Sequence, residues 1–239
     1  MKSKQFFDKT IDIKFNGKSA YRLKKHEWNT NKIEEQVSKL VYNGANLPKD
    51  EKVEEAKLPP FALHFFNIVF EEEKIPTVDY FLNSYFDIFF DKIDNDYVKL
   101  KDIYKSYGFS TTEFKKDSIR YRFSRTIPSL IRDFHFTFLL YENSSYHNVY
   151  YSLNQDYFEG YDIILKHNNV EIGISIYVKT RRGESYKRKK RNRHDYDIRK
   201  EIELAVNLNE CKKAGNIYLL TIEHVKKLEK LIENRDENE

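Results

Sequence analysis

Two charged residues stand at the ends of neighbouring apolar segments, each typical of a β-strand. Asp162 lies near the start of the segment YDIILKH, and Lys179 lies near the end of the segment VEIGISIYVKT. Because side chains alternate along a strand, Lys179 shares one face with Ser175 and Tyr177. A lysine in an apolar setting is costly unless it is paired. A carboxylate held near that lysine across two adjacent strands can bind a hard divalent cation, while the ammonium group positions or activates a water molecule.

A strongly basic stretch begins at Lys179. Residues 179–200 contain eleven Lys or Arg and three acids, which gives a net charge of +8, whereas the whole chain carries only +4. One basic stretch on a mildly acidic body is a candidate contact for nucleic-acid phosphates. The alternatives are a solvated helix or loop, or a protein–protein module whose cations pair with acids elsewhere in the chain. The candidate nucleic-acid-binding residues are Arg181, Arg182, Lys187, Arg188, Lys190, Arg191 and Arg193.

Composition excludes several other classes of protein. The 239 residues include one cysteine, Cys211, so neither an internal disulfide nor a Cys-rich zinc site is expected. No apolar run approaches the roughly 20 residues of a membrane helix, and the first residues lack the apolar centre of a secretion signal. The sequence has neither a P-loop nor a G-x-S-x-G nucleophile elbow. We therefore expect a cytoplasmic protein that does not bind membranes.

The chain before these strands divides into two regions. Region 1–57 predicts a short hairpin that turns at Asn16-Gly17, followed by a helix. The charged, proline-containing residues 48–60 predict a linker or long surface loop. Region 58–117 predicts three helices rich in aromatic residues, the second capped by Thr77 and the third over 97–108. Rings at helical spacing are expected to form a core.

Region 118–235 contains the candidate site. Its pattern predicts a long amphipathic helix or a helix pair, three meandering strands, a helix-compatible basic segment, two further strands and a final helix. These elements are expected, in order, over 118–143, 147–155, 161–167, 170–180, 184–194, 201–208, 216–222 and 223–234. Such an order predicts an α/β core with a mixed sheet. The expected fold class of the chain is therefore α+β or α/β, with a helical N-terminal region ahead of this core.

This arrangement resembles the PD-(D/E)xK nuclease superfamily, whose members share the restriction-endonuclease-like fold. The matching residues are Gly160-Tyr161-Asp162 on the second strand, Tyr177-Val178-Lys179 on the third, and Asp133 on the preceding helix. The resemblance covers about half of the chain. It implies a DNA-directed nuclease in restriction or anti-phage defence, acting with other subunits or as a homo-oligomer. Asp162, Lys179 and Asp133 would be catalytic, and Asp162 and Asp133 would bind Mg²⁺ or Mn²⁺.

One position departs from that family. The superfamily carries Asp or Glu two residues before its lysine, and here that residue is Tyr177, with Ser175 two residues further back. Glu171 points to the same face, but it lies eight residues before Lys179, about 26 Å away along a strand. Two interpretations remain. Either Asp133 replaces the missing carboxylate from the helix, or the site is degenerate and the protein binds nucleic acid or assembles a defence complex without cutting.

These interpretations make geometric predictions. A nuclease site, active or degenerate, requires Asp162 and Lys179 on adjacent strands, with their side-chain ends within about 8 Å. An active site that uses Asp133 requires its carboxylate within about 5 Å of Asp162, which is the span of one shared cation.

Overall fold

The chain folds into two compact units, and one of the boundaries between them falls inside a long helix. The structure, a computed structural model, describes residues 20–22, 27–44, 46–105, 109–110, 112–146, 148–152, 155–168, 170–179 and 201–236. Among these, the first unit takes residues 39–130, and the second takes 20–38 together with 131–236. The sequence predicted three consecutive regions, whereas here an N-terminal segment is grouped with the C-terminal sheet.

The first unit combines helices with a small antiparallel sheet in the strand order β2-β3-β4. Its elements are α3 (Glu51–Glu55), α4 (Phe61–Glu71), α5 (Val78–Phe89), β2 (Phe90–Lys92), β3 (Tyr97–Leu100), α6 (Asp102–Lys105), β4 (Glu113–Lys115) and the first part of α7 (Lys116–Asn143). Aromatic rings fill its core, as predicted. The rings of Phe81 and Phe123 stack with centroids 3.6 Å apart, and Phe61 packs edge-on against Phe81.

Two helix predictions in this unit have different outcomes. Thr77 is confirmed as the N-cap of α5, because its hydroxyl accepts a hydrogen bond of 3.1 Å from the Tyr80 amide. The predicted helix over 97–108 is wrong in its first part, because residues 97–100 form β3, and among the described residues of this range only 102–105 are helical, as α6. The Asp94 carboxylate accepts the Tyr97 amide at 2.7 Å and so closes the turn between β2 and β3. Burial then alternates along β3, which places Val98 and Leu100 in the core.

The predicted linker over 48–60 contains a short helix, α3. Asp50 is its N-cap and accepts the Val53 amide at 3.4 Å. The same carboxylate accepts a hydrogen bond of 2.6 Å from the Ser118 hydroxyl on α7. A polar segment is therefore ordered by its capping bonds, and by its attachment to α7, rather than by its own apolar face.

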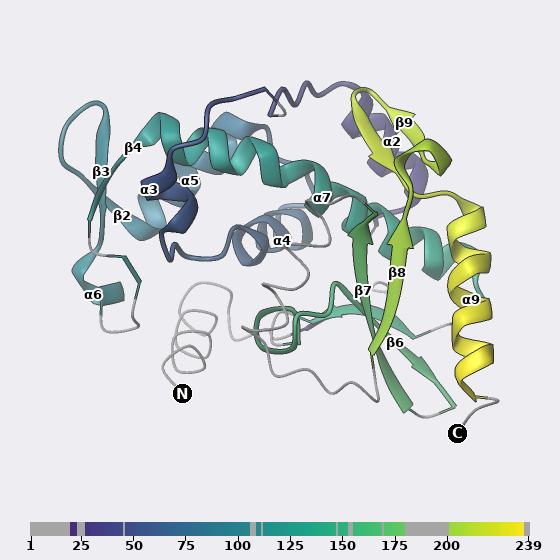
Figure 1. The fold of residues 1–239 in the computed structure, drawn as a ribbon. Coiled ribbons are helices and arrows are strands. Elements are labelled where there is room, and N and C mark those ends of the chain that lie inside the picture. Colours follow the sequence, from purple (N-terminus) through teal and green to yellow (C-terminus); the bar gives the residue numbers. More distant parts are fainter. Residues whose placement is uncertain are drawn as a thin grey trace. The chain divides into compact units, whose positions relative to one another are not determined.

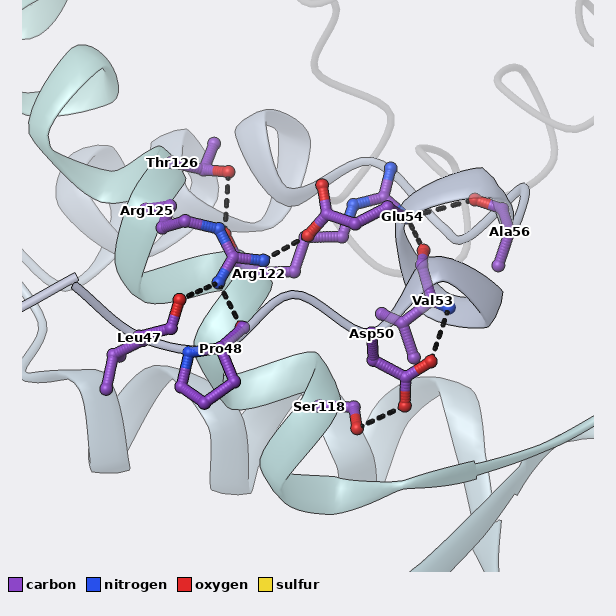
Figure 2. Close-up of polar contacts among 10 residues, drawn as sticks. All are labelled: Leu47, Pro48, Asp50, Val53, Glu54, Ala56, Ser118, Arg122, Arg125 and Thr126. Atoms are coloured by element: carbon purple, nitrogen blue, oxygen red, sulfur yellow. Dashed lines mark hydrogen bonds and ion pairs between the residues drawn. The ribbon is translucent and has the colours of Figure 1, made fainter. Parts of the chain in front are cut away.

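Two arginines of α7 hold the same segment (Figure 2). Arg122 donates to the carbonyl oxygens of Val53 and Ala56, and the second bond measures 3.0 Å. Arg125 donates to the Pro48 carbonyl at 2.7 Å and forms an ion pair with Glu54. The Arg125 side chain is only 5% exposed and that of Glu54 is 22% exposed, so this ion pair is largely shielded from water. These contacts explain why residues 48–60 do not behave as a linker.

The second unit is built on a five-stranded mixed sheet in the order β1-β5-β6-β7-β8. Neighbouring strands are antiparallel except β7 and β8, which are parallel. The elements are β1 (Ala20–Arg22), α2 (Thr30–Ser38), the rest of α7, β5 (Val149–Ser152), η2 (Gln155–Glu159), β6 (Ile163–His167), β7 (Val170–Val178), β8 (Glu201–Val206), η3 (Leu208–Glu210), β9 (Lys212–Ala214), β10 (Ile217–Leu219) and α9 (Ile222–Asp236). The fold is thus mixed α+β, as predicted at that level.

One predicted strand of this unit has a different place in the structure. The segment 216–222 supplies β10, which pairs with β9 in a separate two-stranded sheet instead of joining the main sheet. The main sheet gains β1 instead, which pairs with β5. Helix α9 lies beside β8 (Figure 1). One face of the sheet is an apolar core, with Ile163, Ile174 and Leu204 fully buried.

Candidate functional site

Asp162 is fixed at the point where β6 begins to pair with β7. Its backbone amide donates to the Ile174 carbonyl at 2.9 Å. Its carboxylate accepts the Ile176 amide at 2.7 Å. The carboxylate therefore takes the place of a backbone carbonyl as the acceptor for this amide of β7, and it lies beside the peptide group that joins Ser175 to Ile176. Two separate bonds hold this acid in one position.

Lys179 lies at the far end of the same strand. It follows β7 directly, and its amide donates to the Val206 carbonyl at 2.8 Å, which extends the pairing with β8. Its side chain is exposed. Lys179 lies three positions after the residue whose amide binds Asp162, a distance of about 10 Å along a strand. Asp162 and Lys179 thus belong to adjacent strands, and the approach of their side-chain ends to within 8 Å remains a prediction.

Ser175 occupies the position beside the Asp162 carboxylate. It shares a sheet face with Gly173, Tyr177 and Lys179, because strand side chains alternate. The residue is only 7% exposed, and its hydroxyl oxygen has no hydrogen-bond partner among the described residues. The ring of Tyr161 lies directly on Gly173, where any β-carbon would collide with it. This face is therefore closed at Gly173 by an aromatic ring and carries a buried polar group at Ser175.

Glu203 is a residue of this face that sequence reasoning missed. The parallel register pairs Ser175 with Glu203 and Tyr177 with Ala205. Paired residues of adjacent strands point to the same side of a sheet, so the side chains of Glu203 and Ser175 lie on the same face of the sheet. The signal was present in the alternation EIELAV, where every second residue is buried. What the sequence lacked was the pairing of this strand with β7.

Asp133 lies on α7 and is half-buried. Its backbone carbonyl accepts the Thr137 hydroxyl at 2.8 Å. Whether its carboxylate shares a cation with Asp162 remains a prediction. Across the part of the chain that the structure describes, no three His, Cys, Asp or Glu side chains gather as a metal site. A cation at Asp162 would therefore need other oxygen ligands in addition to carboxylates.

His135, two residues further along α7, has a structural role. Its Nε2 lies 2.8 Å from the Glu34 carboxylate of α2, which also accepts Lys212 of β9 at 2.6 Å. Burial lowers the pKa of His135, although the hydrogen bond and the charge of Glu34 oppose that shift. Burial would raise the pKa of Glu34, but its bonds to Lys212 and His135 outweigh this and lower it. The three side chains tie α2, α7 and β9 together.

The first unit contains an open hollow. It has a volume of about 790 Å³ and is lined by residues of α5, the β2–β4 sheet and the start of α7. Its lining contains both cations, such as Lys92 and Lys115, and acids, such as Asp87 and Asp117. Arg120, also in the lining, is paired with Asp79. Because charges of both signs offset each other, the hollow selects no charged class of ligand.

The remaining predicted residues lie outside the described part of the chain. These are the candidate nucleic-acid contacts Arg181, Arg182, Lys187, Arg188, Lys190, Arg191 and Arg193. Within the described ranges, no helix combines the length and the apolar character needed to span a bilayer. Comparison of the chain with family models, with curated proteins and with solved structures gives no match.

Proposed function

We propose that this protein acts on DNA, and that its second unit is a restriction-endonuclease-like domain that hydrolyses phosphodiester bonds with Mg²⁺ or Mn²⁺. The order of elements supports this: α7 precedes the antiparallel strands β5, β6 and β7, and β8 then pairs parallel to β7. The observation that carries the proposal is the position of Asp162. Its carboxylate is fixed against the third strand of that series, on which Lys179 follows.

The proposed roles follow from the chemistry of the side chains. Asp162 would hold the cation, with Asp133 as a further ligand. The cation would activate water and polarise the phosphate. Lys179 would orient that water or stabilise charge that develops on the phosphate. The basic residues between Arg181 and Arg193 would bind the DNA backbone, which gives affinity without base specificity. We place this activity in restriction or anti-phage defence, with partner subunits or in a homo-oligomer.

A cleavage assay tests this function. Supercoiled plasmid and linear duplex are incubated with the full chain in Mg²⁺, in Mn²⁺ or in EDTA. We expect nicked or linear products with either metal and none in EDTA. The variant Asp162→Asn should lose cleavage, whereas Asp91→Asn should retain it, because Asp91 is an exposed acid on β2 of the other unit. Equal cleavage by the Asp162→Asn variant, or no cleavage with any metal, contradicts the proposal.

A second candidate is a non-catalytic subunit that binds nucleic acid or assembles a defence complex. The residue beside the Asp162 carboxylate favours it, because Ser175 stands there and Tyr177 follows, where a nuclease would carry an acid. This candidate predicts salt-dependent DNA binding without cleavage. The same preparation, assayed for binding and for cleavage, separates the two functions.

A further inference from the structure

We propose that Glu203 supplies the carboxylate that β7 lacks, so that Asp162, Ser175 and Glu203 together bind one Mg²⁺ or Mn²⁺ ion on the face of the sheet that carries Ser175. The inference rests on the proposed function only for the choice of metal. Cation binding by these three residues can be measured without DNA.

The strand register brings the three residues together. Ser175 is paired with Glu203 on β8, and the Asp162 carboxylate bonds to the amide that follows Ser175. The two acids therefore flank Ser175 from opposite sides. Two strand spacings are about 10 Å, a distance that an Asp and a Glu side chain can bridge through one cation with metal–oxygen bonds of about 2.0–2.6 Å.

The Ser175 hydroxyl provides the independent evidence for a ligand. It is 93% buried, since its exposed fraction is 7%, and its oxygen has no hydrogen-bond partner among the described residues. A buried hydroxyl left without a partner costs about 1–3 kcal/mol. A cation, or a water bound to it, would provide the missing partner. The position between two acids means that such a ligand should be positively charged.

The surroundings favour a preformed site for a hard cation. Tyr161, which precedes Asp162 in the chain, is anchored by its packing on Gly173. On β8, the residues before and after Glu203 in the sequence, Ile202 and Leu204, are both buried in the core. Because side chains alternate along a strand, Glu203 must point to the opposite face of the sheet. All three donors are oxygen atoms. Oxygen ligands suit Mg²⁺ and Mn²⁺ rather than Zn²⁺, which is mostly bound by nitrogen and sulfur.

Titration calorimetry of the metal-free full chain with MnCl₂, without DNA, tests the site. We expect one Mn²⁺ per chain, displaced by excess Mg²⁺. Changing groups that only support metal ligands weakens binding about 10–100-fold, so Glu203→Gln and Asp162→Asn should each weaken it by at least about tenfold. Glu201→Gln is the matched control, because Glu201 lies two residues away on the same face of β8 and pairs with Gly173. It should change the affinity by less than about threefold.

Ser175→Ala provides a test that does not depend on changing an acid. In EDTA this variant should unfold at the same temperature as the wild type or higher, because it removes an unpartnered buried hydroxyl. In Mn²⁺ its melting temperature should rise less than that of the wild type, because ligand stabilisation depends on affinity. An equal rise in both proteins contradicts a role for Ser175.

The outcomes also separate this inference from the proposed function. Any of three results overturns the inference. These are a wild-type chain that binds no Mn²⁺, a Glu203→Gln variant that binds Mn²⁺ as tightly as the wild type does, and a Glu201→Gln change that weakens Mn²⁺ binding as much as Glu203→Gln does. Mn²⁺ binding that requires Asp162 and Glu203, in a chain that never cuts DNA, supports the inference and overturns the nuclease proposal alone. If the chain cuts DNA and Glu203→Gln leaves the cleavage unchanged, that result supports the nuclease proposal and overturns this inference.

Discussion

His64 should make the stability of the first unit depend on pH. The residue lies on α4 and is 1% exposed, with its ring 4.9 Å from the ring of Phe81 and 5.8 Å from that of Tyr85, measured between centroids. Neither ring nitrogen has a hydrogen-bond partner within the described residues. Burial lowers its pKa to about 4, and the opposing effect of the Glu72 charge is smaller.

The size of the effect follows from this shift in pKa. In the unfolded chain the His64 ring takes up a proton near pH 6.5, whereas in the folded chain it stays neutral to about pH 4. The unfolded state therefore gains protons first, and stability falls as the pH drops through this interval. One pH unit within it corresponds to about 1.4 kcal/mol, so the loss is about 2 kcal/mol at pH 5 and about 3 kcal/mol in total.

Urea denaturation of the wild type and of the His64→Leu variant, followed by far-ultraviolet circular dichroism at pH 7.5 and pH 5.0, measures this contribution. The variant cannot bind the proton, so the difference in unfolding free energy between the two proteins should change by about 2 kcal/mol between the two pH values, in favour of the variant at pH 5.0. Contributions of other groups, including the buried His135 and His224, cancel in this difference. An equal difference at both pH values would refute the reasoning.

Three further predictions concern other parts of the chain. Arg125→Met should lower the unfolding free energy by about 3 kcal/mol, because it breaks a shielded ion pair. Arg120→Met removes an exposed ion pair and should lower it by less than about 1 kcal/mol. Urea denaturation measures both changes. Gly173→Ala should cost about 1–3 kcal/mol in thermal unfolding, since its β-carbon collides with Tyr161; an unchanged melting temperature would contradict the packing. Replacing four basic residues by Ala should flatten the logarithmic salt dependence of duplex binding by 3 to 4 units, at about 0.9 per lost phosphate contact, whereas a merely solvated segment leaves the slope unchanged. The four residues are Lys187, Arg188, Lys190 and Arg191.

Elements with a clear local pattern could be predicted from the sequence. Alternation of apolar and polar residues marked β7 and β8, and helical spacing marked α5, where Thr77 gave the N-cap. The failures came where local signals compete. The spacing of Tyr97, Leu100 and Tyr104 matches a helix, but the turn formed by Asp94 starts a strand at Tyr97 instead. The polar segment 48–60 has no apolar period, and its order comes from Asp50 and from arginines distant in the sequence.

The candidate site could be predicted only in part, because its geometry is not local. Asp162 and Lys179 stood out by their positions on two consecutive strands. Glu203 did not, because its proximity to Ser175 depends on the parallel pairing of strands that are separated by more than twenty residues. The missing hydrogen bond of Ser175 is likewise a property of the folded sheet. Sequence reasoning therefore found the acid at one side of the site and missed the acid at the other.

Anomalous scattering from crystals soaked in MnCl₂ tests the central claim most directly, because it locates the metal by its own signal. The account predicts one strong peak on the face of the sheet that carries Ser175, between the carboxylates of Asp162 and Glu203 and beside the Ser175 hydroxyl, with metal–oxygen distances of about 2.0–2.6 Å. A well-ordered sheet with no peak at this position, or with Mn²⁺ bound only elsewhere on the chain, would contradict it.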